Sequence, residues 1–225
     1  MINYMKYLIP VLLLSVMSFV VPPKRTKIIF FGDSITQMGV KPGGYIPEMD
    51  TLIKSQDSAG YELEGAGIGG NKVYDLYLRM ETDVLDKQPD IVVIYIGVND
   101  VWHKATSGTG TDPDKFEKFY RAIIKKLQDK NIKVIVCTPA VIGERIDNSN
   151  QQDGDLNRYS SIIRTIAADL KLPVCDLRKT FLEYLRANNA TNAEKGILTT
   201  DRVHLNDAGN LFVARQMWQV IKELK

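Results

Sequence analysis

Residues 28–36 read I-I-F-F-G-D-S-I-T, and this stretch decides the fold. It begins with a continuous apolar run, Ile28 to Phe31, which is typical of a central strand buried on both faces of a parallel sheet. Gly32 ends the run, and Asp33 and Ser34 follow where the strand should meet a loop. Ligands of open parallel sheets bind outside the carboxyl ends of the strands, so Ser34 is a candidate nucleophile. The alternative is that Ser34 only caps a helix.

The rest of the chain alternates between apolar runs of strand length and segments of helical periodicity. Further strands are predicted at 61–66, 91–96, 132–137 and 173–175. Helices are predicted at 45–56, 71–87, 177–187 and 206–224, and around the apolar stripes Phe116 to Leu127 and Leu156 to Leu170; 101–112, 143–154 and 188–200 are predicted to be irregular. This order predicts an α/β fold: a three-layer α/β/α sandwich with a five-stranded parallel sheet in flavodoxin-like order, forming one domain over 22–225.

Composition limits the possible classes of function. The chain has 225 residues, of which 44% are hydrophobic, and a formal net charge of +2. A chain of this size can bury the core of one α/β domain. Charges of both signs are interspersed and no long basic run marks a groove for DNA or RNA, so we expect no nucleic-acid partner.

Residues 1–21 are predicted to lie outside the fold, as a signal peptide or an N-terminal anchor. Lys6 gives a positively charged start, and the apolar run Tyr7 to Val21 contains Pro10. This run is shorter than the ~20 residues that a spanning helix needs, and it resembles the apolar region of a secretory signal. We therefore expect an exported protein, periplasmic or secreted, with no stable membrane partner beyond a retained anchor.

Cys137 and Cys175 each fall in a predicted strand. Strand cysteines usually act as small buried hydrophobic residues, although two cysteines in an exported protein could also pair. Parallel neighbouring strands seldom offer the geometry of a disulfide, so we expect free thiols. Together with only two histidines they do not form a ligand set, and no metal is predicted.

The chain also supplies a candidate general base. His204 follows Asp201 by three residues, immediately before the last predicted helix. A carboxylate at this spacing can reach the imidazole and fix its tautomer, which leaves the other ring nitrogen free to accept the Ser34 proton. The alternative is a surface histidine beside a capping aspartate. His103 has no such partner, and we interpret it as a loop residue near the mouth of the site.

Donors for an oxyanion hole follow the predicted strands. Asn99 comes after the strand at 91–96 and can offer its side-chain amide, whereas Gly70 follows the strand at 61–66 and can offer a backbone N–H. The N–H of Ser34 would be the third donor. The glycines of 65–70 also spell the dinucleotide motif G-x-G-x-x-G, but the acidic residue at the required spacing, Asp90, precedes its strand instead of following it. No cofactor is therefore predicted.

Four motifs in order resemble one family. Gly32-Asp33-Ser34, Gly70, Gly97-x-Asn99-Asp100 and Asp201-x-x-His204 are similar to the four sequence blocks of the SGNH (GDSL-type) hydrolases, from about residue 27 to the C-terminus. The resemblance implies the SGNH hydrolase fold and an esterase with a Ser34, His204 and Asp201 triad, whose oxyanion hole consists of Ser34, Gly70 and Asn99. The first block departs from the family in reading G-D-S-I-T instead of G-D-S-L, and Arg202 stands where the family often has a small residue.

The predicted loops suggest the substrate class. Residues 37–44, 101–112 and 140–154 are mostly polar, and Trp102 is their only large aromatic residue. A long acyl chain would need a continuous apolar groove, whereas polar loops suit a hydroxylated alcohol on whose sugar ring Trp102 can stack. We therefore predict a serine esterase for short, acetyl-type esters of a small molecule or glycan, with Asp33, Trp102 and Arg202 lining the site. The alternatives are a lysophospholipase or thioesterase for longer acyl chains, and a catalytically silent exported binding module.

Overall fold

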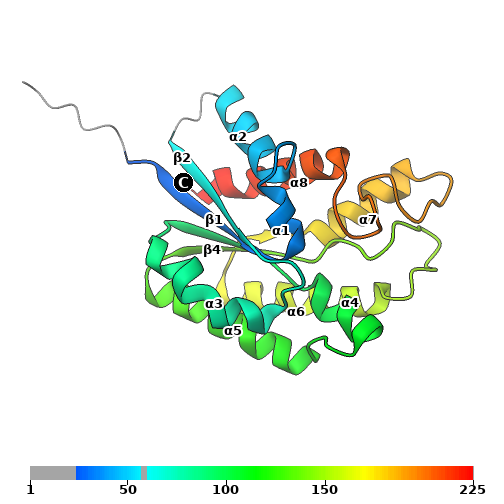
Figure 1. The fold of residues 1–225 in the computed structure, drawn as a ribbon, viewed down its shortest axis with the longest axis horizontal. Helices are drawn as coiled ribbons and strands as arrows, with labels where there is room; N and C mark the ends of the chain where they lie inside the picture. Colours follow the sequence, from blue (N-terminus) through cyan, green and yellow to red (C-terminus); the bar gives the residue numbers. More distant parts are fainter. Residues whose placement is uncertain (1–23, 57–59, 225) are drawn as a thin grey trace, which may run out of the picture.

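Five parallel strands form the central sheet of the protein, in a computed structural model that describes residues 24–56 and 60–224 (Figure 1). The strands are β1 Thr26–Gly32, β2 Tyr61–Gly67, β3 Ile91–Tyr95, β4 Lys133–Cys137 and β5 Val174–Cys175. Their order is β2-β1-β3-β4-β5, and every neighbouring pair is parallel. The predicted fold and flavodoxin-like order are confirmed.

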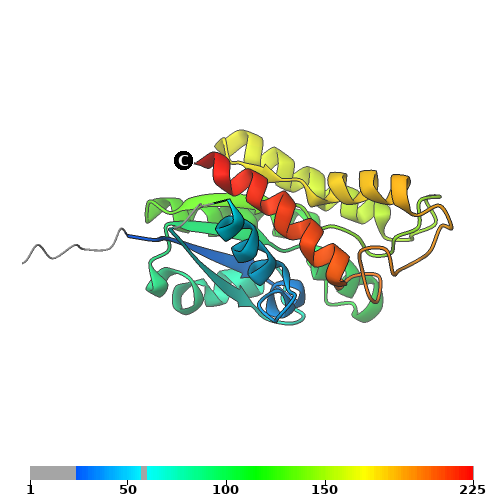
Figure 2. The same ribbon diagram turned by 90° about the horizontal axis from the view of Figure 1, so that it is seen from above.

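Helices cover both faces of this sheet and complete the three layers (Figures 1 and 2). They are α1 Ser34–Gly39, α2 Tyr45–Ser55, α3 Val73–Asp83, α4 Val98–Ser107, α5 Pro113–Asp129, α6 Asp153–Leu170, α7 Leu177–Asn188 and α8 Asp207–Ile221, with 3₁₀ turns at Leu85–Lys87 and Lys222–Leu224. α2 and α8 lie on one face, and α3, α5 and α6 lie on the other (Figure 1).

Strand β1 lies in the interior of the sheet. Its residues Ile28 to Phe31 are all 0% exposed, because β2 and β3 flank the strand and helices cover both of its faces. Successive side chains point to opposite faces. Phe30 meets Tyr45 of α2 edge-on at 5.7 Å between ring centroids, whereas Phe31 packs under the guanidinium of Arg79 of α3 at 4.6 Å. The continuous apolar run is thus explained by two-sided burial.

One predicted loop is a helix. The prediction of an irregular segment over 101–112 is wrong for most of its length, because α4 begins at Val98 directly after β3. Gly97 has φ 127°, which lets the chain turn from strand into helix, and Gly108 ends the helix with φ 67°. Val98 and Val101 bury the apolar side of α4 in the core. A glycine past the end of a short periodic segment is the usual signal for such a helix end.

A second helix, α1, also begins where a loop was predicted, at Ser34. Its N-cap is Asp33, whose side chain accepts a hydrogen bond from the Ile35 N–H at 2.9 Å, so Ser34 is the first helical residue and not the cap. The predicted helix over 71–87 is interrupted after Asp83 and continues as a 3₁₀ turn. The remaining helices lie within a few residues of their predicted positions.

Cys137 and Cys175 lie directly opposite each other in the β4–β5 register, and both are buried free thiols. The predicted signal or anchor segment, 1–21, falls outside the described residues. Within residues 24–56 and 60–224, no helix is both long enough and apolar enough to cross a membrane.

Candidate active site

Ser34 lies at the carboxyl edge of the sheet, where the ends of three strands meet. Gly32, the last residue of β1, is in register with Gly67 of β2 and with Tyr95 of β3. The segments that follow these strands carry Ser34, Gly70 and Asn99. The central strand therefore places the serine between the two other segments from which oxyanion donors were predicted.

A chain of hydrogen bonds joins Ser34 to His204, 170 positions away, and through it to Asp201. Its Oγ lies 2.9 Å from Nε2 of His204, and Nδ1 of the same ring lies 2.6 Å from Oδ2 of Asp201. Burial acts to raise the pKa of the Asp201 carboxyl, but hydrogen bonds from the His204 ring and from two backbone N–H groups outweigh it and hold that pKa below its usual value. An ionised carboxylate can only accept, so Nδ1 carries the proton and the Nε2 lone pair faces the serine hydroxyl.

The turn from Asp201 to His204 is stabilised mainly by its own residues. Asp201 Oδ1 accepts hydrogen bonds from the N–H groups of Val203 at 3.1 Å and His204 at 2.8 Å. The His204 carbonyl accepts one from Thr200 N–H at 2.8 Å. The same carboxylate thus folds the turn with one oxygen and orients the imidazole with the other, which is why the tetrapeptide alone predicted this contact.

The residues before this turn are held by a buried glutamate that the sequence analysis missed. Glu144 is 0% exposed, and its carboxylate accepts the N–H groups of Ile197, Leu198 and Thr199 at 2.8, 2.7 and 2.6 Å. A charged acceptor in the interior is stable only with such donors, and here all three come from one irregular segment. No sequence spacing reveals this contact, because the partners are 53 to 55 residues apart.

The loop after β2 approaches both Ser34 and Asn99. An added Cβ at Gly69 would lie 3.9 Å from Ser34 Cβ, and the carbonyl of Asn71 accepts a hydrogen bond from the Asn99 side chain, Nδ2, at 3.1 Å. Gly70, between them, has φ 76°, a conformation that favours glycine. Asn99 is 2% exposed, so its amide is held in place by burial as well as by this bond.

Trp102 lies beside the ring of His204, and His103 lies beside the loop that contains Gly70. The Trp102 ring is 6.4 Å from the His204 ring between centroids, in an edge-on arrangement. His103 Cε1 would be 3.7 Å from a Cβ at Gly70, which agrees with its predicted place near the mouth of the site. Burial, and to a lesser degree the positive charge of Lys72, lower the pKa of His103, so this ring is neutral at neutral pH.

The structure shows the contacts of two further residues predicted to line the site. Asp33 is 1% exposed and caps α1, so its carboxyl supports the turn at Ser34. Arg202 forms an ion pair with Glu194 at 3.0 Å on the surface. Its φ of 88° is a strained conformation for arginine, and its carbonyl accepts a hydrogen bond from Gly143 N–H.

Two buried carboxyl groups lie behind Ser34. Burial raises the pKa of Asp33 to about 7, the Asp100 charge adds to this rise, and the hydrogen bond from Ile35 opposes it. Burial likewise raises the pKa of Asp100, which is 0% exposed, to about 6, against a hydrogen bond from Val73 N–H at 3.2 Å. The two carboxyls therefore favour their protonated forms below these values, in contrast to the ionised Asp201.

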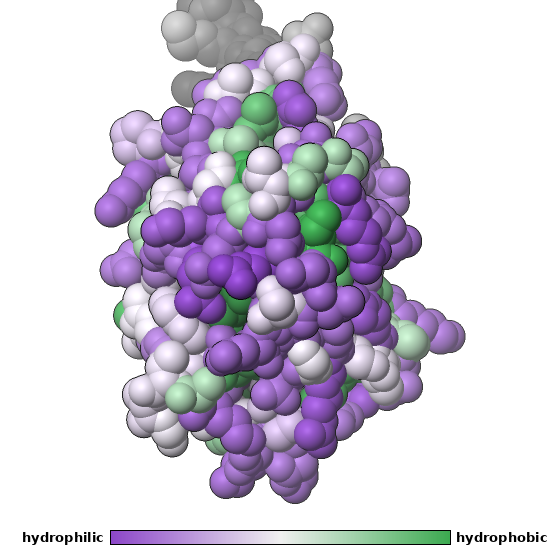
Figure 3. Space-filling model, turned by 90° about the vertical axis from the view of Figure 1, so that its right-hand side faces the viewer, coloured by the Kyte–Doolittle hydropathy of each residue, from purple (hydrophilic) through white to green (hydrophobic). Residues whose placement is uncertain are grey.

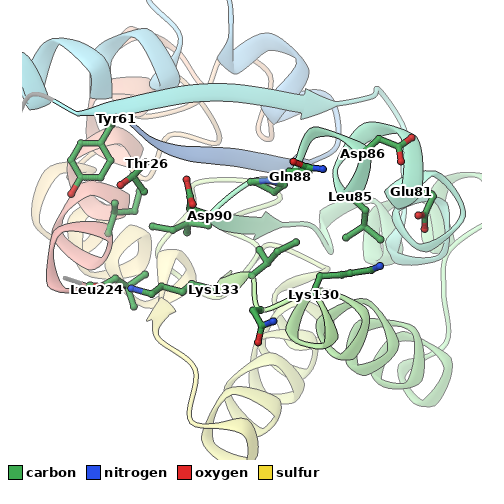
Figure 4. Close-up of a pocket in the computed structure, with 15 residues that line it drawn as sticks. Thr26, Tyr61, Glu81, Leu85, Asp86, Gln88, Asp90, Lys130, Lys133 and Leu224 are labelled. Carbon is green, nitrogen blue, oxygen red and sulfur yellow. Dashed lines mark hydrogen bonds between the residues drawn. The ribbon is translucent and has the colours of Figure 1, made fainter. Parts of the chain in front are cut away.

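A cavity of about 850 Å³ lies at the opposite end of the sheet (Figure 4). Its lining includes Thr26, Tyr61, Ile91 and Lys133, which are the first residues of β1 to β4. It contains none of the predicted site residues. At the other end, the face that carries the loops after the strands is mainly hydrophilic, and its hydrophobic residues form small separate patches (Figure 3). Among the residues with described positions, no three His, Cys, Asp or Glu side chains gather closely enough to hold a metal ion.

Known proteins resemble this chain over most of its length. An acetylxylan esterase of Geobacillus stearothermophilus is 29% identical over 208 residues, which cover 84% of this chain and 90% of that protein. The lipoprotein YqeF of Bacillus subtilis, which is uncharacterized, is 24% identical over 203 residues, covering 81% and 84% of the two proteins.

Among solved structures, an acetyl xylan esterase, AlAXEase, is 64% identical with a TM-score of 0.85, covering 87% of this chain and 99% of that one. A mutant of an acetyl-xylooligosaccharide esterase from Geobacillus is 27% identical with a TM-score of 0.77, covering 88% and 94%. Three further structures are catalytic mutants of the Geobacillus enzyme, with a histidine, a serine or an aspartate replaced by alanine.

The fold and these relatives define the protein as a carboxylic ester hydrolase. The chain belongs to the GDSL-like lipase/acylhydrolase family, whose model matches residues 30–211. The family predicted from the four motifs is confirmed, and so is the class of enzyme. The alternative of a catalytically silent binding module is set aside.

The raised pKa of Asp33 predicts a pH dependence of stability. The folded pKa, about 7, lies above the unfolded value of 3.8, so the folded protein binds this proton more tightly and the free energy of unfolding falls as pH rises from about 4 to 7. Asp33→Asn keeps the N-cap but removes this titration. In urea unfolding from pH 4 to 8, the free energy of unfolding should decline less for Asp33→Asn than for the wild type. The difference should be roughly 1.4 kcal/mol for each unit by which the folded and unfolded pKa values of Asp33 differ. Equal declines in the wild type and in Asp33→Asn would contradict the raised pKa of Asp33.

Glu144→Gln should loosen the segment before the Asp201–His204 turn. The amide keeps one acceptor oxygen and turns an NH₂ group toward backbone donors, which should lower the free energy of unfolding by about 1–3 kcal/mol. Hydrogen exchange at residues 197–199 should accelerate and kcat should fall. Glu194→Gln, in the same segment, removes only exposed ion pairs and should cost less than about 1 kcal/mol. Equal effects of the two variants would show that the buried carboxylate has no special role.

Proposed function

We propose that this protein is a serine esterase that removes short acyl groups, chiefly acetyl, from a carbohydrate substrate. Ser34 is the nucleophile, His204 the general base and Asp201 the residue that orients it. The single observation that carries the proposal is the continuous hydrogen-bonded chain from Ser34 Oγ through His204 to Asp201, with distances of 2.9 and 2.6 Å. A nucleophile, a base and an orienting carboxylate in hydrogen-bond contact are the requirement for acyl transfer.

The reaction has two stages. Ser34 Oγ attacks the ester carbonyl carbon while its proton passes to His204 Nε2, and the carbonyl oxygen becomes an oxyanion. The tetrahedral intermediate collapses, the alcohol leaves with the proton from Nε2, and an acyl group remains on Ser34. A water molecule then attacks the acyl carbon, giving its proton to Nε2, and the second collapse returns that proton to Ser34 and releases the carboxylic acid. Asp201 stays ionised throughout and stabilises the imidazolium.

The developing oxyanion needs donors that are already in place. The proposed donors are the N–H of Ser34, in the first turn of α1, the N–H of Gly70, and the side-chain amide of Asn99. The first-turn N–H groups of a helix have no partner within that helix, so they are available to an anion. Asn99 donates one of its two amide hydrogens to the Asn71 carbonyl, and the other is available to the substrate.

The relatives support both the residues and the substrate class. In the Geobacillus enzyme, the aspartate and the histidine replaced in the catalytic mutants are three positions apart, as are Asp201 and His204 here. AlAXEase and the Geobacillus protein are both described as acetylxylan esterases. The hydrophilic face around the loops, with Trp102 beside His204, suits a hydroxylated alcohol better than a lipid (Figure 3). The predicted export, which rests on residues 1–21, fits a polysaccharide substrate and belongs to this proposal.

A second candidate, an esterase for longer acyl chains, is favoured by one observation. Met38 and Val40, at the end of α1, and Ile68, directly after β2, are large hydrophobic residues that are 37, 47 and 43% exposed. They lie on the two segments that flank Ser34. Side chains in this position could form an apolar wall, although each buried methylene is worth only ~0.8 kcal/mol.

Substitution of the proposed residues should give graded losses of kcat. We expect roughly a 10⁶-fold loss for Ser34→Ala, since a triad acts as a unit. Asp201→Asn should cost about 10⁴-fold because it favours the wrong histidine tautomer. Asn99→Ala should cost about 10²- to 10³-fold because one oxyanion donor is removed. Hydrolysis of p-nitrophenyl acetate measures all three.

A fluorophosphonate probe provides the control for this series. It should label the wild type and Ser107→Ala, which changes an exposed serine at the end of α4, but not Ser34→Ala. Wild-type turnover or labelling in Ser34→Ala would overturn the proposed nucleophile.

Acyl-chain length distinguishes the two candidates. With a series of p-nitrophenyl esters, kcat/KM should be highest at about two to four carbons, since the polar loops offer little area for burying a longer chain. Acetate should also be released from acetylated xylan. A maximum at about eight carbons or more, together with no acetate release from xylan, would favour the second candidate.

A further inference from the structure

The guanidinium of Arg79, on α3, binds the ends of β1 and β2 and the loop that follows β2. Its Nη2 donates to the carbonyls of Gly32 at 2.7 Å and Ala66 at 3.0 Å, and its Nε donates to Asn71 Oδ1 at 2.7 Å. Its Nη1 donates to Asp83 at 2.6 Å, and the plane stacks on Phe31 at 4.6 Å. The side chain is 14% exposed, so these bonds form largely away from solvent.

Each of these acceptors adjoins a proposed donor of the oxyanion hole. Gly32 ends β1, two residues before Ser34, and Ala66 lies near the end of β2, four residues before Gly70. Asn71 directly follows Gly70, and its carbonyl accepts the bond from Asn99 Nδ2 at 3.1 Å. Arg79 therefore binds the segments that supply Ser34 and Gly70 directly, and it reaches the third donor, Asn99, through Asn71.

We propose that Arg79 is a positioning residue that fixes the relative placement of the three oxyanion donors. The proposal rests on the proposed serine-esterase function. The donors follow three different strands, and nothing within any one segment sets their mutual distances. An oxyanion hole works only if its donors lie at about 2.7–3.1 Å from the developing charge, and a displacement of about 1 Å can cost 10²-fold in rate.

The geometry requires a guanidinium and not simply a positive charge. Arginine offers five N–H donors in a rigid plane, so it can bind two carbonyls with one nitrogen and an amide with another at fixed angles. Lysine has a single flexible ammonium group and cannot span the same acceptors in the same plane. The face of the guanidinium is also supported by Phe31, which is part of the buried centre of β1.

The test compares Arg79→Lys and Arg79→Met with the wild type on p-nitrophenyl acetate. Both variants should lose about 10- to 100-fold in kcat while KM changes by less than about threefold, because the defect concerns the transition state and not substrate binding. Arg164→Met is the matched control. It removes an arginine that binds Asp176 through two bonds of 2.8 and 2.9 Å and contacts none of the three segments, so kcat should be unchanged.

A double variant separates positioning from general destabilisation. If Arg79 acts through the oxyanion hole, Arg79→Met should cost less in an Asn99→Ala background than in the wild type, because one of the donors that it places is already absent. Independent, multiplying losses would indicate a structural role and overturn the proposal, as would a folded Arg79 variant with wild-type kcat. Circular dichroism and urea midpoints establish folding. If neither Arg79 variant folds, Asn71→Ala carries the test, since it removes the Nε acceptor but keeps the carbonyl that binds Asn99.

The outcomes for the two proposals remain distinguishable. Full activity in Ser34→Ala would refute the serine mechanism itself. Loss of activity in Ser34→Ala and Asn99→Ala, with unchanged kcat in Arg79→Lys and Arg79→Met, would leave that mechanism intact and refute only the role of Arg79.

Discussion

Two-sided burial of β1 is the constraint on which the rest of the structure depends. Because Ile28 to Phe31 are fully buried, the strand can occupy only a central position in a sheet that has helices on both faces. Its carboxyl end then meets the ends of β2 and β3 at one level, and the chain must turn there. Gly32 permits the turn, Asp33 caps the helix that follows, and Ser34 is left at the junction. The position of the proposed nucleophile is thus a consequence of core packing.

Long-range contacts hold the remaining parts of the site, and two charged side chains make many of them: Arg79, which is largely buried, and Glu144, which is fully buried. Arg79 supplies N–H donors to carbonyls at the ends of strands, and Glu144 supplies acceptors to N–H groups of the segment before His204. The positive Arg79 binds carbonyl oxygens, which carry a partial negative charge, and the negative Glu144 binds N–H groups, which carry a partial positive charge. Irregular segments near a sheet edge leave such groups without ladder partners, and a buried ion compensates several of them at once.

The sequence predicted the strands and the contact between Asp201 and His204 because these features are local. The sheet order and the pairing of Ser34 with His204, 170 residues apart, were predicted instead from the alternation of strands and helices and from the four ordered motifs. Apolar runs define strands, and the contact between Asp201 and His204 spans three residues. Arg79 and Glu144 could not be predicted in this way, because their partners lie up to 47 and 55 residues away and single lysines, arginines and glutamates usually mark solvated surfaces. The helix α4 was missed for a different reason. Its polar composition outweighed the signal of Gly97 and Gly108 at its two ends.

The choice of charged rather than neutral side chains at these two positions also has a physical reason. Removing a charge from water is costly, so a buried ion is retained only where its hydrogen bonds are numerous and well aligned. The same hydrogen bonds also fix the partners in place, because an ion with such bonds tolerates little displacement of them. A neutral amide or hydroxyl would satisfy fewer groups and would permit more movement. Arg79 and Glu144 therefore restrict the two segments in which small movements would matter most for the proposed reaction. One segment carries proposed donors of the oxyanion hole, and the other precedes His204. The same argument accounts for Asp201, which is partly exposed and yet fixed, since its two oxygens bind three donors of a single turn.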